Sequence, residues 1–425
     1  MRGLASFRRL GVCVLALLGT WFGGVRGGGS AWAEEPPVNR SDSELAPRRY
    51  ELAGFPIVGG NTDIGVQFGA VATLTRFHDG VKPYLWNVDL LLSAAVKGDQ
   101  GKFRVTQQSY LLRSDAPDLF AGRLRVDAFG SFQRTINAGY YGIGNATTAS
   151  PAPGAAEMGT RYHYIHQEGR ARVIARVHTK SPVDIAFGGN LRYVVPEAYA
   201  GSKLAEDGAD VRGLAPTALL GIATGIMVDT RDTEFVTTRG IFYQIGVGGS
   251  LGSGSAPAYG NTSMVLSHYA PLGGPVVFAS RVVASFELGD VPFYDLAQGG
   301  TFEPQYLLGS ESGVRGVPQG RYAGLVKVIA NIELRTVFPR FRLLGQRFRP
   351  GTTVFADGGR VWRSYRFDPA QDGTKLRLKW GLGGGVFLQW GEAAIFRLEA
   401  AYSPEAVAEN PRFPIGIYVS DGLMF

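Results

Sequence analysis

Residues 376–390, LRLKWGLGGGVFLQW, decide the fold that we predict for this chain. Large apolar side chains share one parity along this stretch, while the other parity holds glycines and the polar residues Arg377, Lys379 and Gln389. Alternation with a period of two predicts a β-strand whose two faces meet different surroundings. The stretch is longer than the roughly five or six residues of a typical soluble strand. Its length and its mid-strand charges are typical of a membrane-spanning strand with lipid on one side and a polar interior on the other.

The same alternation continues from about residue 64 to the end of the chain and predicts sixteen strands. Their connections are alternately short and long, and an even number of strands places both termini in the periplasm. The expected fold is therefore all-β, a transmembrane antiparallel β-barrel of sixteen strands. A fourteen-strand or partly open barrel is the alternative, because proline and glycine weaken the first predicted strand. The predicted strands are 50–60, 63–77, 83–97, 102–114, 118–133, 160–178, 183–195, 217–231, 240–251, 260–271, 276–289, 321–338, 351–363, 375–390, 393–402 and 414–425.

The first residues predict an export signal. Arg2, Arg8 and Arg9 precede a short apolar run, and Ala31-Trp32-Ala33 offers small residues to a signal peptidase. We therefore expect a signal peptide over 1–33, a short periplasmic segment over 34–49 and the barrel over 50–425. An uncleaved helical anchor is the alternative, but the apolar run is shorter than the roughly 20 residues of a spanning helix.

Removal of the signal peptide would change both the charge and the cysteine content. The net charge falls from +7 to +3, because residues 1–33 carry four arginines and no acidic residue. An excess of this size does not indicate nucleic-acid binding. Cys13 is the only cysteine of the chain and lies in the predicted signal peptide. The mature chain is therefore expected to have no disulfide, no thiol chemistry and no zinc cluster.

Several stretches resemble the motifs of one known family. Residues 309–317, GSESGVRGV, resemble its loop signature, and residues 331–333, NIE, and 355–362, FADGGRVW, resemble two of its strand motifs. Residues 229–232, DTRD, followed by Gly240, resemble a turn of the same family. In this order and spacing, the chain resembles the BamA/TamA superfamily of barrel-assembly and two-partner-secretion proteins, also called the bacterial surface antigen family. The resemblance implies that the long extracellular loop between strands eleven and twelve folds into the barrel.

Arg315, followed by Gly316, is the centre of the predicted loop site. Glu333 and Asp357 lie on the inward-facing parities of the next two strands. A guanidinium can bind carboxylates through bidentate, charge-assisted hydrogen bonds. Such a loop lock would tie the loop inside the barrel, as the resemblance also implies, whereas a solvated loop charge is the alternative. The chain departs from the family pattern at Val317, where the family has an aromatic residue.

The first and last predicted strands are weak where a barrel has to close. Proline donates no ladder hydrogen bond, and glycine packs nothing. We therefore expect a lateral seam between strands one and sixteen, marked by Pro56, Gly59, Gly60, Pro414, Gly416 and Gly422. At the end of the last strand, Val419, Leu423 and Phe425 resemble the C-terminal targeting signal that the barrel-assembly machinery recognises.

Two further groups of charges have alternative interpretations. One is a predicted lumen stripe, which either favours anionic solutes or simply hydrates a polar interior; it comprises Arg123, Arg125, Asp127, Arg170, Arg172, Arg176 and His178. The other lies among phenylalanines in one long periplasmic connection and comprises Arg340, Arg342, Arg347 and Arg349. This connection either rests on anionic lipid headgroups or is a solvated turn with snorkelling arginine stems.

No catalytic, metal-binding or cofactor site is predicted. Residues 309–313, GSESG, have glutamate where a hydrolase elbow has serine, and His163, His166 and Glu168 lack a regular ligand spacing.

The resemblance implies a bacterial outer-membrane protein, not an enzyme, that acts in protein insertion, translocation or membrane remodelling. A passive or gated pore and a surface-exposed structural or adhesion barrel are the alternatives. Expected partners are outer-membrane lipids, the barrel-assembly machinery during biogenesis and a client or secreted protein. Because about sixteen residues separate the predicted signal peptide from the first strand, we expect a stand-alone barrel without the family's POTRA domains.

Overall fold

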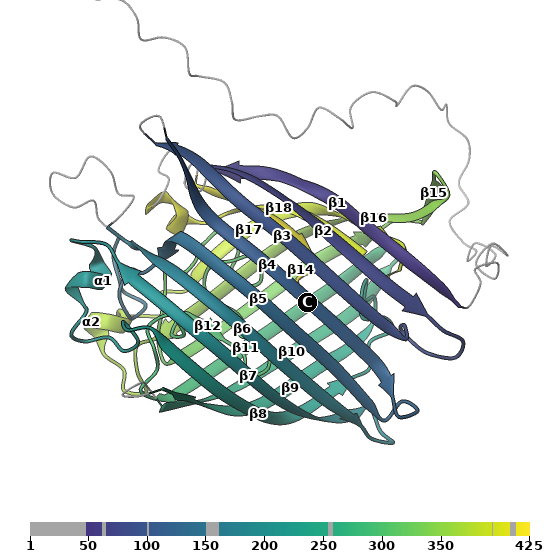
Figure 1. Cartoon of the computed structure of the whole chain (residues 1–425), viewed down its shortest axis with the longest axis horizontal. Coiled ribbons are helices and arrows are strands. Elements are labelled where there is room, and N and C mark those ends of the chain that lie inside the picture. The colour runs from purple at the N-terminus through teal and green to yellow at the C-terminus, as the bar shows by residue number, and fades with distance from the viewer. Residues whose placement is uncertain are drawn as a thin grey trace, which may run out of the picture. The chain divides into compact units, whose positions relative to one another are not determined.

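Sixteen long strands form one antiparallel sheet (Figure 1). The computed structural model describes residues 48–61, 65–99, 102–149, 161–253, 258–392, 394–408 and 414–425. The predicted signal peptide and nearly all of the segment 34–49 lie outside these residues. The strands are β1 (Arg49–Asn61), β2 (Gly65–Phe77), β3 (Trp86–Asp99), β4 (Lys102–Leu119), β5 (Leu124–Gly139), β6 (His163–His178), β7 (Val183–Ala198), β8 (Thr217–Asp229), β9 (Gly240–Gly252), β10 (Ala258–Gly273), β11 (Val276–Gly289), β14 (Val326–Val337), β16 (Gln346–Trp362), β17 (Lys379–Trp390), β18 (Ala394–Tyr402) and β19 (Ile415–Asp421).

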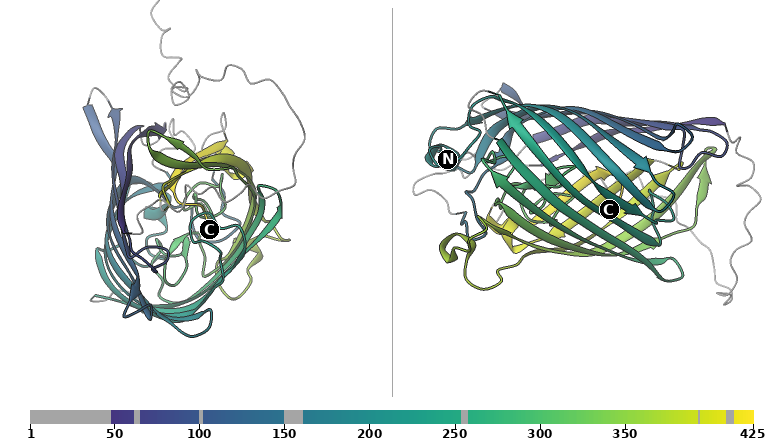
Figure 2. Two further views of the ribbon diagram at one scale, coloured as in Figure 1. Left: turned by 90° about the vertical axis from the view of Figure 1, so that its right-hand side faces the viewer. Right: turned by 90° about the horizontal axis from the view of Figure 1, so that it is seen from below.

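Each long strand pairs with its successor, and the sheet curls around a filled interior (Figure 2). The loop that joins β11 to β14 lies inside the ring of strands and contains the short pair β12 (Gln298–Gly299) and β13 (Gln305–Tyr306). β15 (Phe341–Leu343) forms a hairpin with the start of β16. The predicted sixteen-strand fold with an inward-folded loop is thus confirmed. We call the end of the sheet that carries this loop the extracellular end, and the opposite end the periplasmic end.

The two faces of the wall differ as the alternation predicts. On β7, Ile185, Phe187 and Leu191 point outward and are about half exposed. Their neighbours Asp184 and Arg192 point inward and are buried. Within the described ranges nothing covers this apolar outer face, and lipid acyl chains are the surroundings that suit it.

Aromatic rings mark the two edges of the outer apolar band. At the periplasmic end, the ring centroid of Trp390 lies 5.5 Å from that of Phe348 and 6.5 Å from that of Phe396. At the extracellular end, Trp380 lies 6.0 Å from Tyr402. The two tryptophans are ten residues apart on β17, which at about 3.4 Å per residue and a tilt of about 40° corresponds to about 26 Å along the barrel axis. This agrees with the height of about 25 Å typical of the apolar band of outer-membrane barrels.

The helices are short: α1 (Lys203–Glu206), α2 (Pro369–Asp372) and the 3₁₀ helix η2 (Pro404–Ala408). Within the described ranges, none has the length and hydropathy of a membrane span.

Several strands begin later than predicted. β5 begins at Leu124 instead of residue 118, because Phe120 and Ala121 have positive φ angles. β14 and β17 begin late because contacts with other segments engage the backbone of their predicted first residues. Arg360 donates hydrogen bonds to the carbonyl oxygens of Lys375 and Leu376, and Lys375 has a φ of +65°, so β17 begins only at Lys379. Residues 321–325 belong to the loop instead of β14. There the backbone N–H of Gly324 donates to the carbonyl oxygen of Leu296 within the same loop.

The last strand ends at Asp421, whereas the alternation predicts a strand to residue 425. Gly422 has a φ of +71°, and the chain turns into the lumen after it. Arg335 donates to the carbonyl oxygen of Phe425 at 2.9 Å, and its guanidinium carbon lies 4.8 Å from the centroid of the Phe425 ring. The prediction that the last strand runs to Phe425 is therefore wrong, because the chain leaves the strand at Gly422 and lumen arginines bind the C-terminal residues.

Candidate functional site

Arg315, from the loop between β11 and β14, binds carboxylates from three strands of the wall that follows this loop. Its Nε and Nη2 donate to the two carboxylate oxygens of Asp357 on β16 at 2.7 and 2.9 Å. Its Nη1 donates to Glu333 on β14 at 2.7 Å and to Glu399 on β18 at 3.1 Å. The side chain is fully buried, and its guanidinium lies 3.3 Å above the centre of the Phe355 ring. The structure thus brings together the predicted residues Arg315, Glu333 and Asp357.

Glu399 is a member of this cluster that the sequence prediction missed. Its position was available in the pattern, since Phe396 and Leu398 take the outward parity of β18 and leave Arg397 and Glu399 facing inward. Arg335 donates to Glu333 at 2.7 Å, and Arg397 lies 3.6 Å from Glu399. The three carboxylates therefore face three guanidinium groups, and Arg315 is the only one of these that comes from the loop.

Glycines allow the loop backbone to approach the wall. Gly316 has a φ of +88°, a conformation that side-chain-bearing residues rarely adopt. Its backbone N–H donates to the hydroxyl of Tyr418 on β19 at 2.7 Å. At Gly381 on β17, an added Cβ would lie 1.8 Å from the carbonyl oxygen of Arg315. The glycine-rich face of β17 therefore provides the space that the loop occupies.

An apolar cluster supports the same part of the loop. Val314 and Val317 are buried against Ile329 of β14 and Val361 of β16, and Leu307 and Leu308 from the earlier part of the loop complete the contact. Val317, which replaces the family's aromatic residue, is 1% exposed. The smaller side chain is thus fully packed in this protein.

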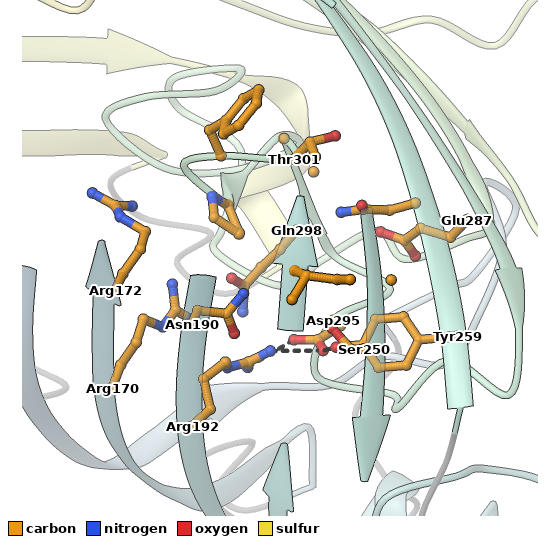
Figure 3. Close-up of a pocket in the computed structure, with 17 residues that line it drawn as sticks. Arg170, Arg172, Asn190, Arg192, Ser250, Tyr259, Glu287, Asp295, Gln298 and Thr301 are labelled. Atoms are coloured by element: carbon orange, nitrogen blue, oxygen red, sulfur yellow. Dashed lines mark hydrogen bonds and ion pairs between the residues drawn. The ribbon is translucent and has the colours of Figure 1, made fainter. Parts of the chain in front are cut away.

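The first half of the loop binds the opposite wall with the opposite charge. Asp295 receives two hydrogen bonds from Arg192 of β7, at 2.8 and 2.9 Å, and one from the hydroxyl of Tyr259 at 2.6 Å (Figure 3). Glu303 receives one from Arg172 of β6 at 3.1 Å. The loop therefore carries two carboxylates to arginines of β6 and β7, and one arginine to carboxylates of β14, β16 and β18.

Six of the seven residues of the predicted lumen stripe lie within ion-pair distance of an oppositely charged group, whereas Arg123 is exposed in the turn before β5. Arg170 and Arg192 share Glu168, and Arg176 binds Asp184 at 2.7 Å. The cavity beside the loop that Arg170, Arg172 and Arg192 line has a volume of about 50 Å³ (Figure 3). A space of that size holds only a few water molecules. The arrangement is that of a neutralised, hydrated interior, which was the simpler of the two interpretations.

A periplasmic turn enters the lumen from the other end. Residues 230–239 connect β8 to β9, and Asp232 shapes this turn by accepting hydrogen bonds from the backbone N–H groups of Thr233 and Thr238. Val236 is buried among inward-facing side chains of β17 and β18, and Glu234 accepts two hydrogen bonds from Arg125 of β5 at 2.7 and 2.8 Å. Burial alone would raise the pKa of Glu234, but pairing with Arg125 lowers it from 4.5 to about 2.

The first and last strands are not joined by a backbone ladder within the described residues. β1 pairs with β2 along its whole length, through Pro56, Gly59 and Gly60. Among the residues that the structure describes, β19 pairs with β18 alone; it contains Gly416, begins after Pro414 and ends before Gly422. The six predicted seam residues thus lie in, or next to, the two strands between which no ladder is described.

Side chains connect this edge at the periplasmic end. Glu51 of β1 accepts a hydrogen bond from the backbone N–H of Glu392, in the turn between β17 and β18, at 3.2 Å. Arg347 of β16 lies 3.6 Å from the carboxylate of Glu51 and 3.3 Å from that of Glu392. We call these three residues, Glu51, Arg347 and Glu392, the seam latch. The Glu51 carboxylate thereby joins β1 to the turn between β17 and β18 and to the start of β16.

Sixteen amphipathic strands, two aromatic borders and a loop held in the interior define a bacterial outer-membrane β-barrel. The Omp85 superfamily domain matches residues 97–417, and the chain belongs to this superfamily. BamA from Haemophilus ducreyi, in a structure lacking POTRA domains 1–3, aligns with a TM-score of 0.48 and 16% identity over 88% of this chain and 70% of that one. CdiB from Escherichia coli aligns with a TM-score of 0.51 and 14% identity over 89% of this chain and 63% of that one.

CdiB from Acinetobacter baumannii aligns with a TM-score of 0.42 and 12% identity over 84% of this chain and 62% of that one. The chain therefore spans less than two thirds of the length of either CdiB structure. No curated protein sequence matches the chain.

Proposed function

We propose that this barrel acts through its wall, by parting β1 from β19 to insert or translocate a client protein strand or to thin the bilayer beside the seam. Membership of the Omp85 superfamily supports an insertion or translocation barrel as the general class. The observation that carries the more specific proposal is the seam latch. Two wall edges that are joined by a few polar side-chain contacts separate at lower cost than two edges joined by a ladder of backbone hydrogen bonds.

An unpaired strand edge is costly inside a membrane. Each backbone group left unpaired in lipid costs several kcal/mol, so a closed barrel is expected to pair its first and last strands fully. β19 has seven residues against thirteen in β1, so even complete pairing with β19 would leave part of the edge of β1 unpaired. The unpaired backbone groups of such an edge can form hydrogen bonds with an added strand from a client, as in β-augmentation.

The occupied lumen argues against a passive pore. The loop crosses the interior from Arg192 to Asp357, and the turn 230–239 fills part of the periplasmic mouth. A gated pore would require both segments to leave. The lateral path needs neither to move, and we therefore place the pore second.

Cross-linking across the latch tests this proposal. Glu51→Cys and Glu392→Cys would be combined in a Cys13→Ser background and joined by a short, reducible bis-thiol cross-linker. The matched control is Thr75→Cys with Asn87→Cys, a pair that lies directly opposite in the intact β2–β3 ladder. Both proteins would be reconstituted in vesicles, where the folding rate of a urea-unfolded outer-membrane barrel is measured by its heat-dependent gel mobility.

We expect the uncross-linked protein to accelerate client folding. The latch cross-link should abolish the acceleration and reduction should restore it, while the control cross-link has no effect. If the latch cross-link left the acceleration intact, the wall would not be the route. If no variant accelerated folding and ion conductance in planar bilayers persisted with the latch cross-linked, the pore would be the better explanation.

A further inference from the structure

The loop between β16 and β17 is an interaction surface that the proposed function does not use. We call residues 363–378 the rim loop. It contains α2, which Figure 1 shows at the extracellular end of the sheet, the same end as α1. None of its residues belongs to the lock around Arg315 or to the seam latch.

A buried arginine holds the rim loop against the outer side of the wall. Arg360 has the outward parity of β16, as has Val354, which is 64% exposed, but Arg360 itself is 5% exposed. Its guanidinium donates hydrogen bonds to the carbonyl oxygens of Asp372 at 3.1 Å, of Lys375 at 2.6 Å and of Leu376. Because an outward-facing side chain is buried only where something covers the outer face, the rim loop lies on the lipid-facing side of β16 at its extracellular end.

The apolar side chains of the rim loop continue the outer apolar band past its aromatic border. Trp380 belongs to that border, and Leu378 and Leu376 precede it in the chain with the same parity. Leu376 is 67% exposed, and Tyr365 and Phe367 are about half exposed. Aromatic side chains gather at the level of the lipid headgroups. The rim loop therefore has the composition of a segment that lies in this layer.

The rim loop also carries basic side chains without ion pairs. It has four basic residues against two acidic ones. Arg366, Lys375 and Arg377 are exposed, and among the residues that the structure describes no carboxylate pairs with any of them. Lys375 and Arg377 have φ angles of +65° and +40°, which residues with side chains rarely adopt. Hydrogen bonds from Arg360 and from Asn145 to the carbonyl oxygens of this stretch hold it in that conformation.

The acidic residues of the rim loop are occupied by its own backbone. Asp372 is fully buried and accepts hydrogen bonds from the backbone N–H groups of Arg363 and Asp368, at 2.8 and 2.9 Å. Asp368 accepts one from the backbone N–H of Ala370 at the start of α2. The two carboxylates thus stabilise the fold of the loop and do not pair with its exposed basic side chains.

The loop that contains α1 differs in this respect. It lies at the same end of the sheet, but its basic residues and the neighbouring Arg161 are paired with carboxylates. The pairs are Arg161–Glu206, Lys203–Asp207 and Arg212–Asp290. Compared with this loop, the rim loop carries its positive charge unpaired.

We propose that the rim loop binds the phosphate groups of the glycolipid in the outer leaflet of the bacterial outer membrane. Arginine and lysine side chains bind phosphate through charge-assisted hydrogen bonds. The headgroup layer lies at the aromatic border, where the rim loop folds onto the wall. The phosphates then lie against Arg366, Lys375 and Arg377, and the acyl chains of the same lipid against Leu376 and Leu378. This inference does not depend on the parting of the seam.

A fluorescent label in the rim loop tests the proposal. Thr374→Cys, at an exposed position, would carry an environment-sensitive probe in a Cys13→Ser background. The protein would be placed in phosphatidylcholine nanodiscs that contain increasing fractions either of lipid A, a diphosphorylated glycolipid, or of lipid A freed of both phosphates. Quenching by acrylamide, a neutral molecule, measures the access of water to the label. The matched control is Ala209→Cys, at an exposed position of the loop that contains α1.

We expect lipid A to protect the label at residue 374 and to leave the label at residue 209 unchanged. A triple variant should lower the apparent affinity for lipid A by about 100-fold, since each basic residue near an anionic membrane surface changes such an equilibrium by about fivefold. Its substitutions are Arg366→Gln, Lys375→Gln and Arg377→Gln. The control variant removes the same charge from the other loop and should leave the affinity unchanged; its substitutions are Arg161→Gln, Lys203→Gln and Arg212→Gln.

Heat-dependent gel mobility verifies that each variant is folded. Absence of protection by lipid A would overturn the proposal. Equal protection by the phosphate-free lipid would also overturn it, because the phosphates would then have no part in binding. Protection that persists in the triple variant of the rim loop would exclude its basic side chains as the phosphate ligands.

Discussion

Replacement of Arg315 by alanine should release the tip of the lumen loop without unfolding the wall. The substitution removes a guanidinium that donates hydrogen bonds to Asp357, Glu333 and Glu399 in a fully buried position. Charged hydrogen bonds are each worth about 1.5–3 kcal/mol, and removal of one partner of a buried ion pair costs about 3–5 kcal/mol. The strands keep their backbone ladders, so we assign the whole cost to docking of the loop.

A loss of about 3–5 kcal/mol raises the population of the undocked loop by a factor of roughly 10² to 5 × 10³. Proteolysis reports this population when opening is fast compared with cleavage. Thermolysin is the suitable protease, because it cuts at apolar residues such as Leu307 and Leu308 and does not need the arginine that is removed. The initial rate of cleavage within residues 300–318 is the quantity to measure.

Two variants calibrate the result. Arg212→Ala removes an arginine whose pairing with Asp290 is exposed on both sides, and such pairs contribute about 0–1 kcal/mol, so cleavage of the loop should change little. Arg315→Lys keeps the charge but loses the fork that binds Asp357, and it should fall between alanine and the natural residue. If Arg315→Ala changed the cleavage rate no more than Arg212→Ala does, the apolar cluster around Val317 would be sufficient to hold the loop, and our assignment of the lock to ion pairing would be wrong.

Two further predictions concern the filled lumen. Gly381→Ala should release the loop as Arg315→Ala does, because its Cβ would clash with the Arg315 carbonyl oxygen at 1.8 Å. Gly169→Ala is the control and should leave the loop in place, because its Cβ would meet nothing within 4 Å. The rate of thermolysin cleavage within residues 300–318 tests both variants. Glu234→Gln should increase the frequency of channel openings in planar bilayers at pH 7, because it breaks the pairing that holds the turn 230–239 to Arg125. The natural protein should show no increase between pH 7 and pH 5: with its pKa lowered from 4.5 to about 2, Glu234 stays charged there, and its stabilising effect is lost only as the pH falls toward 2. Openings that increase in the natural protein on mild acidification would assign the gate to another group.

The alternation of apolar and polar residues predicted the strands of the wall, because every strand faces lipid on one side and the polar lumen on the other. The same parity identified Glu333 and Asp357 as inward-facing, and it could also have identified Glu399. Parity alone, however, does not state which inward residues lie at one height, since this depends on the stagger between strands. That information is contained in the register, for example in the pairing of Asn331 with Asp357, which no single strand reveals.

Sequence reasoning misjudged or missed the segments whose course is set by contacts remote in sequence. The turn 230–239 is short and polar, and only its contacts with Arg125, Phe387 and Ile395 show that it folds inward. The C-terminal residues keep the right parity for a strand, but the positive φ of Gly422 and the arginines of distant strands redirect them. In both cases, contacts that are remote in sequence outweigh the local pattern.

The opposite charges on the two halves of the lumen loop have an electrical consequence. Withdrawal of the loop would take two carboxylates, Asp295 and Glu303, away from the wall formed by β4 to β7, and one guanidinium, that of Arg315, away from the wall formed by β14 to β18. The first wall would become more positive and the second more negative. An emptied barrel would therefore carry a transverse electric field across its water-filled interior, and any ion or dipolar chain that entered would be turned by it. The docked loop compensates the charges of both walls and so prevents this field.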